Sequence, residues 1–118
     1  MDEITLNGIV YVPKTEKAKQ LDGMKYVIVR TYSAGVHAGY LDEHIGKEVI
    51  LINSRRLWEW AGAFTLSELA KKGTTDPKNC KFATTIDEIL LTEAIEVIPC
   101  TAEAQKSIES VGDYDVNR

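Results

Sequence analysis

The stretch GKEVILINSRRLWEWAG, residues 46–62, decides how the rest of the chain is organised. Within residues 47–53, one face of an extended chain would carry Val49 and Leu51, and the opposite face would carry two isoleucines. Apolar side chains on both faces are typical of a strand that is covered on both sides. The run RRLWEWAG, residues 55–62, then continues as a strand or as a bulged extension of one.

The segments before this stretch predict its partners in a sheet. In KYVIVRTY, residues 25–32, the β-branched residues Val27, Val29 and Thr31 alternate with a second set of side chains. This period of two indicates a strand. Gly35 allows the chain to turn after it. Residues 36–42 and 47–53 then form the arms of a hairpin whose loop carries Gly46.

Two short helices follow from their end signals. In TLSELAKKG, residues 65–73, Thr65 is the expected N-cap and Glu68 completes a capping box, while the final glycine ends the helix. Thr101 is the expected N-cap of a second helix over residues 102–111.

These elements predict an α+β fold, with a mostly antiparallel β-sheet and two short helices. The last strands are expected within residues 82–100. We place one domain at residues 24–118, preceded by an N-terminal hairpin and linker at residues 1–23 with its turn at Asn7-Gly8.

Composition excludes some classes of partner. The 118 residues carry a formal net charge of -4, which argues against a diffuse, salt-driven grip on DNA or RNA. A small anionic ligand remains possible, because a few local arginines can outweigh a mildly acidic remainder. We expect no signal peptide, no membrane span and a cytoplasmic protein whose two cysteines, Cys80 and Cys100, are free thiols.

No catalytic or metal-binding pattern stands out, and we expect no cofactor. Ser33 lies outside any nucleophile motif. His37 and His44 are interpreted as hairpin residues, and Asp42 with Glu43 as part of a solvated hairpin tip.

The arginines and tryptophans of residues 53–62 allow two interpretations. Arg56, Trp58 and Trp60 share one face of the expected strand, opposite Arg55. We favour a tryptophan pair in the core with an arginine stacked over it. The alternative is a site in which an aromatic ring stacks on a base and a guanidinium pairs with phosphate.

Other aromatic residues raise the same question. Arg30 and Tyr32 form a second arginine–aromatic pair on one strand face. Phe82 follows the polar run DPKNCK, residues 76–81, and is either an exposed aromatic or a strand residue that enters the core.

Three long segments resemble a known family. They are YVIVRTYSAGVHAGYL (residues 26–41), GKEVILINSRRLWEWAGAFTLSELAKKGT (residues 46–74) and EILLTEAIEVIPCTAEAQKSI (residues 88–108). They are similar to small phage proteins of the first type of Thoeris anti-defence family, which act as sponges for a signalling nucleotide.

The resemblance implies a function and partners. Thoeris is a bacterial defence system in which an enzyme makes a cyclic ADP-ribose isomer as a messenger. The family binds this messenger, here expected to be glycocyclic ADP-ribose, and sequesters it without cleavage in the cytoplasm of the infected host. It also implies a homo-oligomer, from dimer to hexamer, with the messenger at subunit contacts and separate sites for cyclic di- or trinucleotides in some members.

The resemblance also implies site residues. Phe82 is expected to stack on adenine, and the loop at residues 73–81 to act as a lid. Arg55 and Arg56 are expected to hold phosphates, while Trp58 is left mostly to packing. The remaining candidates are the four residues of the segment Arg30, Thr31, Tyr32 and Ser33, which build either the pocket or the core, and Lys106 near the C-terminus.

Two functions of other classes stay open. A hydrolase of cyclic nucleotides would need a positioned base, for which His37 with Asp42 or Glu43 is the candidate set. A purely structural module would use the arginine–aromatic cluster as a subunit contact.

Overall fold

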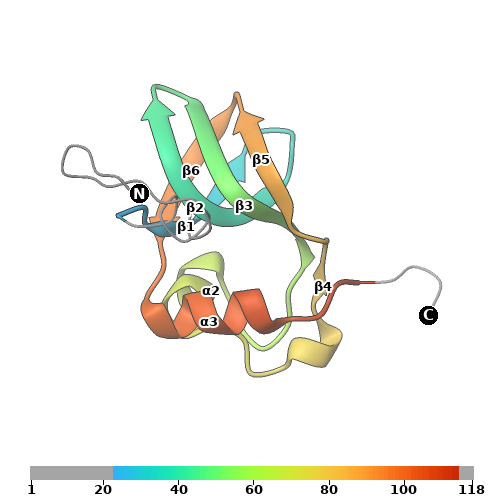
Figure 1. The fold of residues 1–118 in the computed structure, drawn as a ribbon. Coiled ribbons are helices and arrows are strands. Elements are labelled where there is room, and N and C mark those ends of the chain that lie inside the picture. The colour runs from blue at the N-terminus through green and yellow to red at the C-terminus, as the bar shows by residue number, and fades with distance from the viewer. Residues whose placement is uncertain (1–22, 115–118) are drawn as a thin grey trace, which may run out of the picture.

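A computed structural model of the protein describes residues 23–114. The predicted N-terminal hairpin and most of its linker lie outside the described residues. Within them the chain forms six strands, two α-helices and one short 3-10 helix (Figure 1). The strands are β1 (Tyr26–Thr31), β2 (Val36–Ile45), β3 (Glu48–Glu59), β4 (Lys81–Phe82), β5 (Ile86–Leu91) and β6 (Ala94–Pro99). The helices are α2 (Leu66–Lys72), the 3-10 helix η1 (Pro77–Asn79) and α3 (Ala102–Ser110).

The strands form one sheet in which all pairings between strands are antiparallel. The order is β4-β3-β2-β1-β6, and β5 also pairs with β3. These features confirm the predicted α+β fold with a mostly antiparallel sheet and two short helices. The predicted hairpin is also confirmed, with β2 and β3 as its arms and Gly46 at its turn with a φ of 60°.

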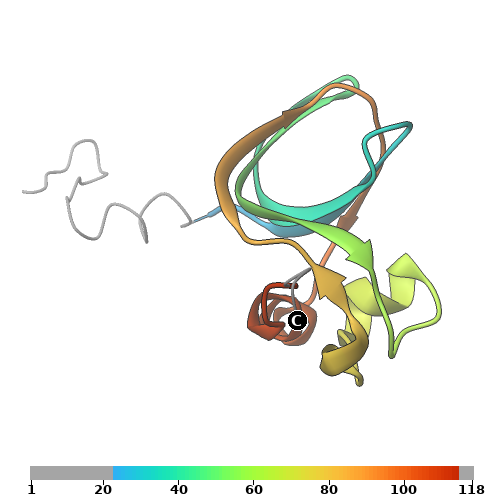
Figure 2. The same cartoon turned by 90° about the vertical axis from the view of Figure 1, so that its right-hand side faces the viewer.

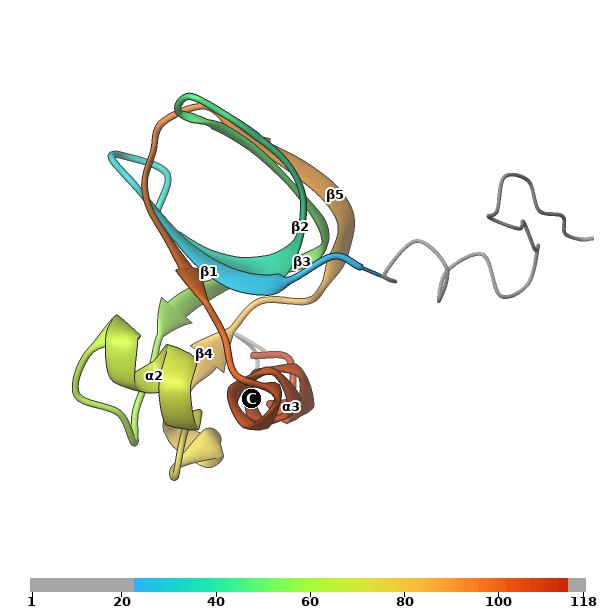
Figure 3. The ribbon, with the colours of Figure 1, turned by 90° about the vertical axis from the view of Figure 1, so that its left-hand side faces the viewer.

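The sheet curls on itself into a ring, with α2 and α3 side by side below it (Figures 2 and 3). Strand β3 divides between the two regions. Its first half pairs with β5 from Val49 to Ser54, within the curl. Its second half pairs with β4 at Leu57 and Glu59, beside the helices. The length of β3 thus joins the ring to the helical layer.

The alternation along β1 supplies two separate cores. Val27 and Val29 belong to the core inside the curl, whereas Tyr26 and Ile28 belong to the core between the sheet and the helices. The inner core also contains Val49, Leu51, Leu91 and Ala94. The second core also contains Ala38, Tyr40, Leu57, Leu69, Ala70, Cys80, Phe82, Ile108 and Val111.

A bulge in β3 exchanges the faces of that strand. Asn53 has a φ of 50°, and the pairing of β2 with β3 shifts between Ala38 and Tyr40, opposite this residue. An extra residue in one strand reverses which side chains face which way. Leu51 therefore points into the curl, whereas Leu57, of the same parity, points toward the helices.

The helix caps agree with the sequence. The Thr65 hydroxyl accepts a hydrogen bond from the Glu68 N–H, and the Thr101 hydroxyl accepts one from the Ala104 N–H. The Glu68 carboxylate accepts the N–H of Phe64, one residue before the expected partner. Local side-chain chemistry is thus sufficient to set both helix starts.

Truncating the ring of Phe82 tests the second core. Phe82 is fully buried, whereas Phe64 is 90% exposed. We expect Phe82→Ala to lower the free energy of unfolding by about 3–5 kcal/mol, because it removes a buried ring and leaves a cavity. Phe64→Ala, the matched control, should change it by less than about 0.5 kcal/mol. Urea denaturation measures both, and equal effects would contradict the packing described.

Candidate ligand-binding site

Arg55 is a structural residue, which corrects the expectation that it binds phosphate. Its side chain is buried, at 3% exposure. Its Nε donates to the Ala83 carbonyl, and Nη1 donates to the carbonyls of Ile108 and Val111 at the end of α3. Its Nη2 donates to Asp113 Oδ1 at 3.1 Å. The bulge in β3 turns this guanidinium toward the end of α3, where a helix lacks part of its internal hydrogen bonding, and it donates to two carbonyls there.

Phe82 is also a core residue and does not offer an exposed face to a base. It is fully buried, and the Arg55 guanidinium carbon lies 5.4 Å from its ring centroid. The expectation of an exposed stacking ring is therefore wrong for this structure, and the alternative of a strand residue entering the core is correct. Pairing of Phe82 with Leu57 across β3 and β4 carries the ring inward.

The loop at residues 73–81, expected to act as a lid, makes hydrogen bonds to the rest of the domain. The Thr74 N–H donates to the Ser107 hydroxyl, and the Thr74 hydroxyl donates to the Ala61 carbonyl. The Cys80 thiol is buried beside the same carbonyl, at 3.6 Å. In this structure the loop therefore braces α3 and the end of β3 against each other. It does not cover an exposed Phe82.

The segment Arg30–Ser33 does not converge on one pocket. Arg30 Nε pairs with Glu96 Oε1 at 2.9 Å, and Ser33 donates to Glu93. The buried Thr31 hydroxyl donates to the Gly35 carbonyl and accepts the Ala34 N–H, so it shapes the turn. Tyr32 is 79% exposed.

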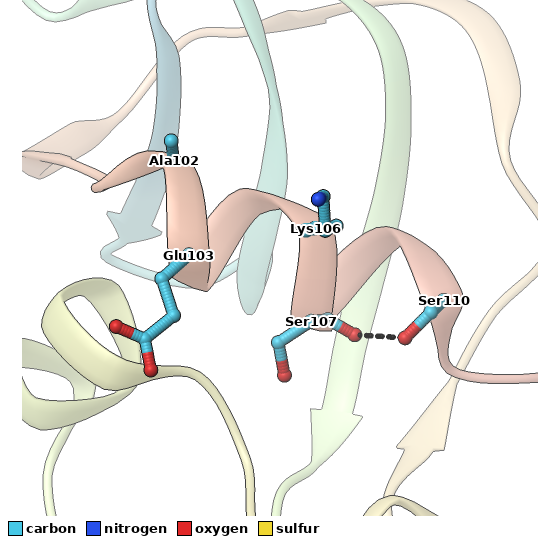
Figure 4. Close-up of a pocket in the computed structure, with 5 residues that line it drawn as sticks. All are labelled: Ala102, Glu103, Lys106, Ser107 and Ser110. Atoms are coloured by element: carbon cyan, nitrogen blue, oxygen red, sulfur yellow. Dashed lines mark hydrogen bonds between the residues drawn. The ribbon is translucent and has the colours of Figure 1, made fainter.

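Lys106 borders a hollow on the outer side of α3. Figure 4 shows the hollow with its lining residues, Ala102, Glu103, Lys106, Ser107 and Ser110. Its volume is about 540 Å³, and the described residues that line it all come from this helix. They include one cation and one carboxylate but no aromatic ring, so this hollow offers no plane on which a base could stack.

Arg56 and Trp58 form the arrangement best suited to a ligand. Both side chains are exposed, Trp58 at 63%, and the Arg56 guanidinium carbon lies 5.1 Å from the indole. The Arg56 guanidinium has no hydrogen-bond or ion-pair partner within residues 23–114. The shared face predicted for these two residues is confirmed, whereas the predicted burial of Trp58 in the core is wrong. After the bulge in β3, Leu57 points toward the helices, so the face that carries Arg56 and Trp58 points away from them.

A hollow of about 390 Å³ adjoins this indole. Its lining residues are Trp58, Lys81, Phe82, Ala83 and Tyr114. Lys81 Nζ lies 5.3 Å from the Tyr114 ring centroid and 3.4 Å from Glu59 Oε1. We call Arg56, Trp58, Lys81 and Tyr114 the cation–aromatic surface.

Sequence reasoning missed Lys81 and Tyr114. Lys81 reaches the surface because β4 pairs with the end of β3, opposite Glu59. Tyr114 reaches it because its N–H donates to the Phe82 carbonyl at 2.9 Å. Neither contact has a local sequence signal, since both join segments that are distant in the chain.

His37 lies opposite Arg56 in the pairing of β2 with β3. Its side chain is buried, and Nε2 lies 2.9 Å from the Ala34 carbonyl oxygen. Burial lowers the pKa of His37, the hydrogen bond to Ala34 opposes this effect, and the charge of Arg56 lowers the pKa further. At neutral pH the imidazole of His37 is therefore neutral, and it lies across the strand pair from Arg56.

The comparisons with known proteins give a family and no function. The model of a domain of unknown function, DUF6948, matches residues 24–108. The chain belongs to this DUF6948 family. No curated protein and no solved structure matches the chain.

Two further findings concern residues 23–114 of this DUF6948 protein. None of the helices there is long and apolar enough to cross a membrane. No group of three or more His, Cys, Asp or Glu side chains in that part of the chain is placed to hold a metal ion. Its cysteines, Cys80 and Cys100, are free as expected, and burial raises the pKa of Cys100 to about 12.

Replacing Arg55 with lysine tests its structural role. Lysine keeps the charge but cannot present the planar donors with which Arg55 reaches five backbone and side-chain oxygens. We expect Arg55→Lys to lower the free energy of unfolding by about 2–3 kcal/mol, because buried carbonyls lose their donors. Arg30→Lys, at an exposed ion pair, should change it by less than about 1 kcal/mol. Similar values in urea denaturation would contradict this role.

The lowered pKa of His37 predicts a pH dependence of stability. The unfolded chain takes up a proton near pH 6.5, whereas the folded protein does so only at lower pH. The contribution of His37 is therefore complete above about pH 6.5 and decreases as pH falls from there toward its folded-state pKa. We expect the melting temperature to fall over this window in the native protein and to fall less in His37→Gln. Parallel pH curves for the two proteins would contradict the assignment.

Proposed function

We propose that this protein binds a small phosphate-bearing nucleotide on its cation–aromatic surface and sequesters it without cleaving it. The observation that carries the proposal is the Arg56 guanidinium, which stacks on an exposed indole and has no anionic partner within residues 23–114. The other two arginines described already have oxygen partners, Arg30 at Glu96 and Arg55 in the core. Arg56 is therefore the arginine with donors to spare for a phosphate.

The chemistry of this surface fits a nucleotide. An exposed indole face can stack on a base, a contact worth about 1–3 kcal/mol. A guanidinium presents paired donors that match phosphate oxygens, and Lys81 supplies a second cation across the hollow. The hollow between Trp58 and Tyr114 provides an apolar surface for the flat part of such a ligand.

The resemblance to the Thoeris anti-defence family suggests which nucleotide to test. We propose glycocyclic ADP-ribose as the messenger, with cyclic di- and trinucleotides as further ligands, inside the infected bacterial host. A nanomolar complex requires about −12 kcal/mol, which is more than one stacked base provides. A second copy of the chain that covers the ligand would supply the difference, so the homo-oligomer is part of the proposal.

The positions of the acid and base candidates support binding over hydrolysis. His37 is buried with its Nε2 at a backbone carbonyl, whereas Asp42 and Glu43 are exposed farther along β2. Five residues of strand separate His37 from Asp42 by about 16 Å. The set proposed for a hydrolase therefore does not meet at one reacting atom.

Titration calorimetry with glycocyclic ADP-ribose tests this function. We expect the native protein to bind it and to release it unchanged when the complex is denatured by heat. Arg56→Ala and Trp58→Ala should each weaken binding about tenfold or more, because a charged hydrogen bond or a stacked base is lost. Arg30→Ala is the matched control, since that arginine is also exposed but already paired.

The outcomes separate the three functions. Recovery of a cleaved nucleotide would favour the hydrolase. A protein that binds none of the three nucleotide classes but is oligomeric would favour the structural module. Equal affinity of Arg56→Ala and the native protein for the nucleotide would show that the ligand does not bind at this surface.

A further inference from the structure

Gly35 lies in the turn between β1 and β2, directly against the candidate site. Its φ is 86°, in the left-handed region that favours glycine. The turn is held by Thr31, whose N–H and hydroxyl both donate to the Gly35 carbonyl. His37 adds a further contact through the Ala34 carbonyl. These hydrogen bonds hold the backbone of Gly35 in one position beside the candidate site.

The guanidinium of Arg56 occupies the space where a side chain at position 35 would begin. A Cβ built on Gly35 would lie 2.6 Å from Arg56 Nη2 and 2.8 Å from Nε. The guanidinium carbon also lies 5.1 Å from the Trp58 ring centroid. The guanidinium thus lies close to both the Gly35 backbone and the Trp58 indole.

We infer that Gly35 is a positioning residue for ligand binding, because its missing side chain lets Arg56 take up a fixed place over Trp58. An exposed arginine usually samples many rotamers, and fixing it on binding opposes affinity. An arginine already held in place loses less freedom, so the complex is tighter. The ligand in this inference rests on the proposed function, whereas the placement of Arg56 by Gly35 does not.

Gly46 offers a matched comparison. It also has a positive φ, 60°, but a Cβ there would meet nothing within 4 Å. Alanine at either position therefore introduces backbone strain, and only alanine at position 35 meets Arg56. Because a guanidinium ends a flexible side chain, we expect it to swing away from an added methyl group while the fold persists.

The first test needs no ligand. Protons of Arg56 that lie over the Trp58 ring should have NMR resonances shifted upfield, and Trp58→Ala should remove this shift. We expect Gly35→Ala to remove it too, with a loss of melting temperature similar to that of Gly46→Ala. Gly46→Ala should keep the upfield shift. Unchanged Arg56 resonances in Gly35→Ala would overturn the inference.

If Gly35→Ala does not fold, a second variant at the same position can still test the inference. Asparagine tolerates the left-handed region better than alanine does. Gly35→Asn therefore reduces the backbone strain while it still places a Cβ against the guanidinium. It should displace the Arg56 resonances in the same way, and retention of the native shift in this variant would also overturn the inference.

The final test measures affinity for glycocyclic ADP-ribose. We expect Gly35→Ala to bind about tenfold or more weakly, to the level of Arg56→Ala, while Gly46→Ala binds as the native protein does. Native affinity in Gly35→Ala with displaced Arg56 resonances would overturn the positioning role. If the native protein binds no nucleotide, the proposed function fails, and the NMR comparison still decides whether Gly35 places Arg56.

Discussion

The buried guanidinium of Arg55 joins β3 to the end of α3 and to the segment after β4 through hydrogen bonds. From the middle of β3 it donates to the last carbonyls of α3 and to the carbonyl of Ala83 after β4. Asp113 accepts a further hydrogen bond, at the point where the chain runs beside Phe82. A helix end and a sheet edge both need donors inside the protein, and one planar cation supplies them.

The bulge at Asn53 makes this arrangement possible. Without the extra residue, Arg55 would share the face of Val49 and Leu51 and would point into the apolar core inside the curl. With it, Arg55 faces the helices, and the adjacent Arg56 faces the opposite side, across from His37. One backbone irregularity thus divides two neighbouring arginines between a structural role and a candidate binding role.

The candidate site depends on the same frame. Trp58 stays exposed because the helices pack against the other face of β3, which carries Leu57. Arg56 stays over Trp58 because the turn at Gly35, held by Thr31, leaves room for it. The cations of this surface therefore stand on rigid strands, which suits the recognition of a ligand of fixed shape.

The sequence by itself determined the strands, the hairpin and both helix caps, because these depend on alternation and on contacts within a few residues. It also determined that Arg56 and Trp58 share a face, since side chains alternate along a strand. It could not assign Phe82, Arg55 or Trp58 correctly. The burial of each depends on β4 and α3, which are distant in the chain and whose packing has no local signal. Only the tertiary structure decided which arginine has hydrogen-bond partners and which has none within residues 23–114, because such partners are set by where segments meet in space.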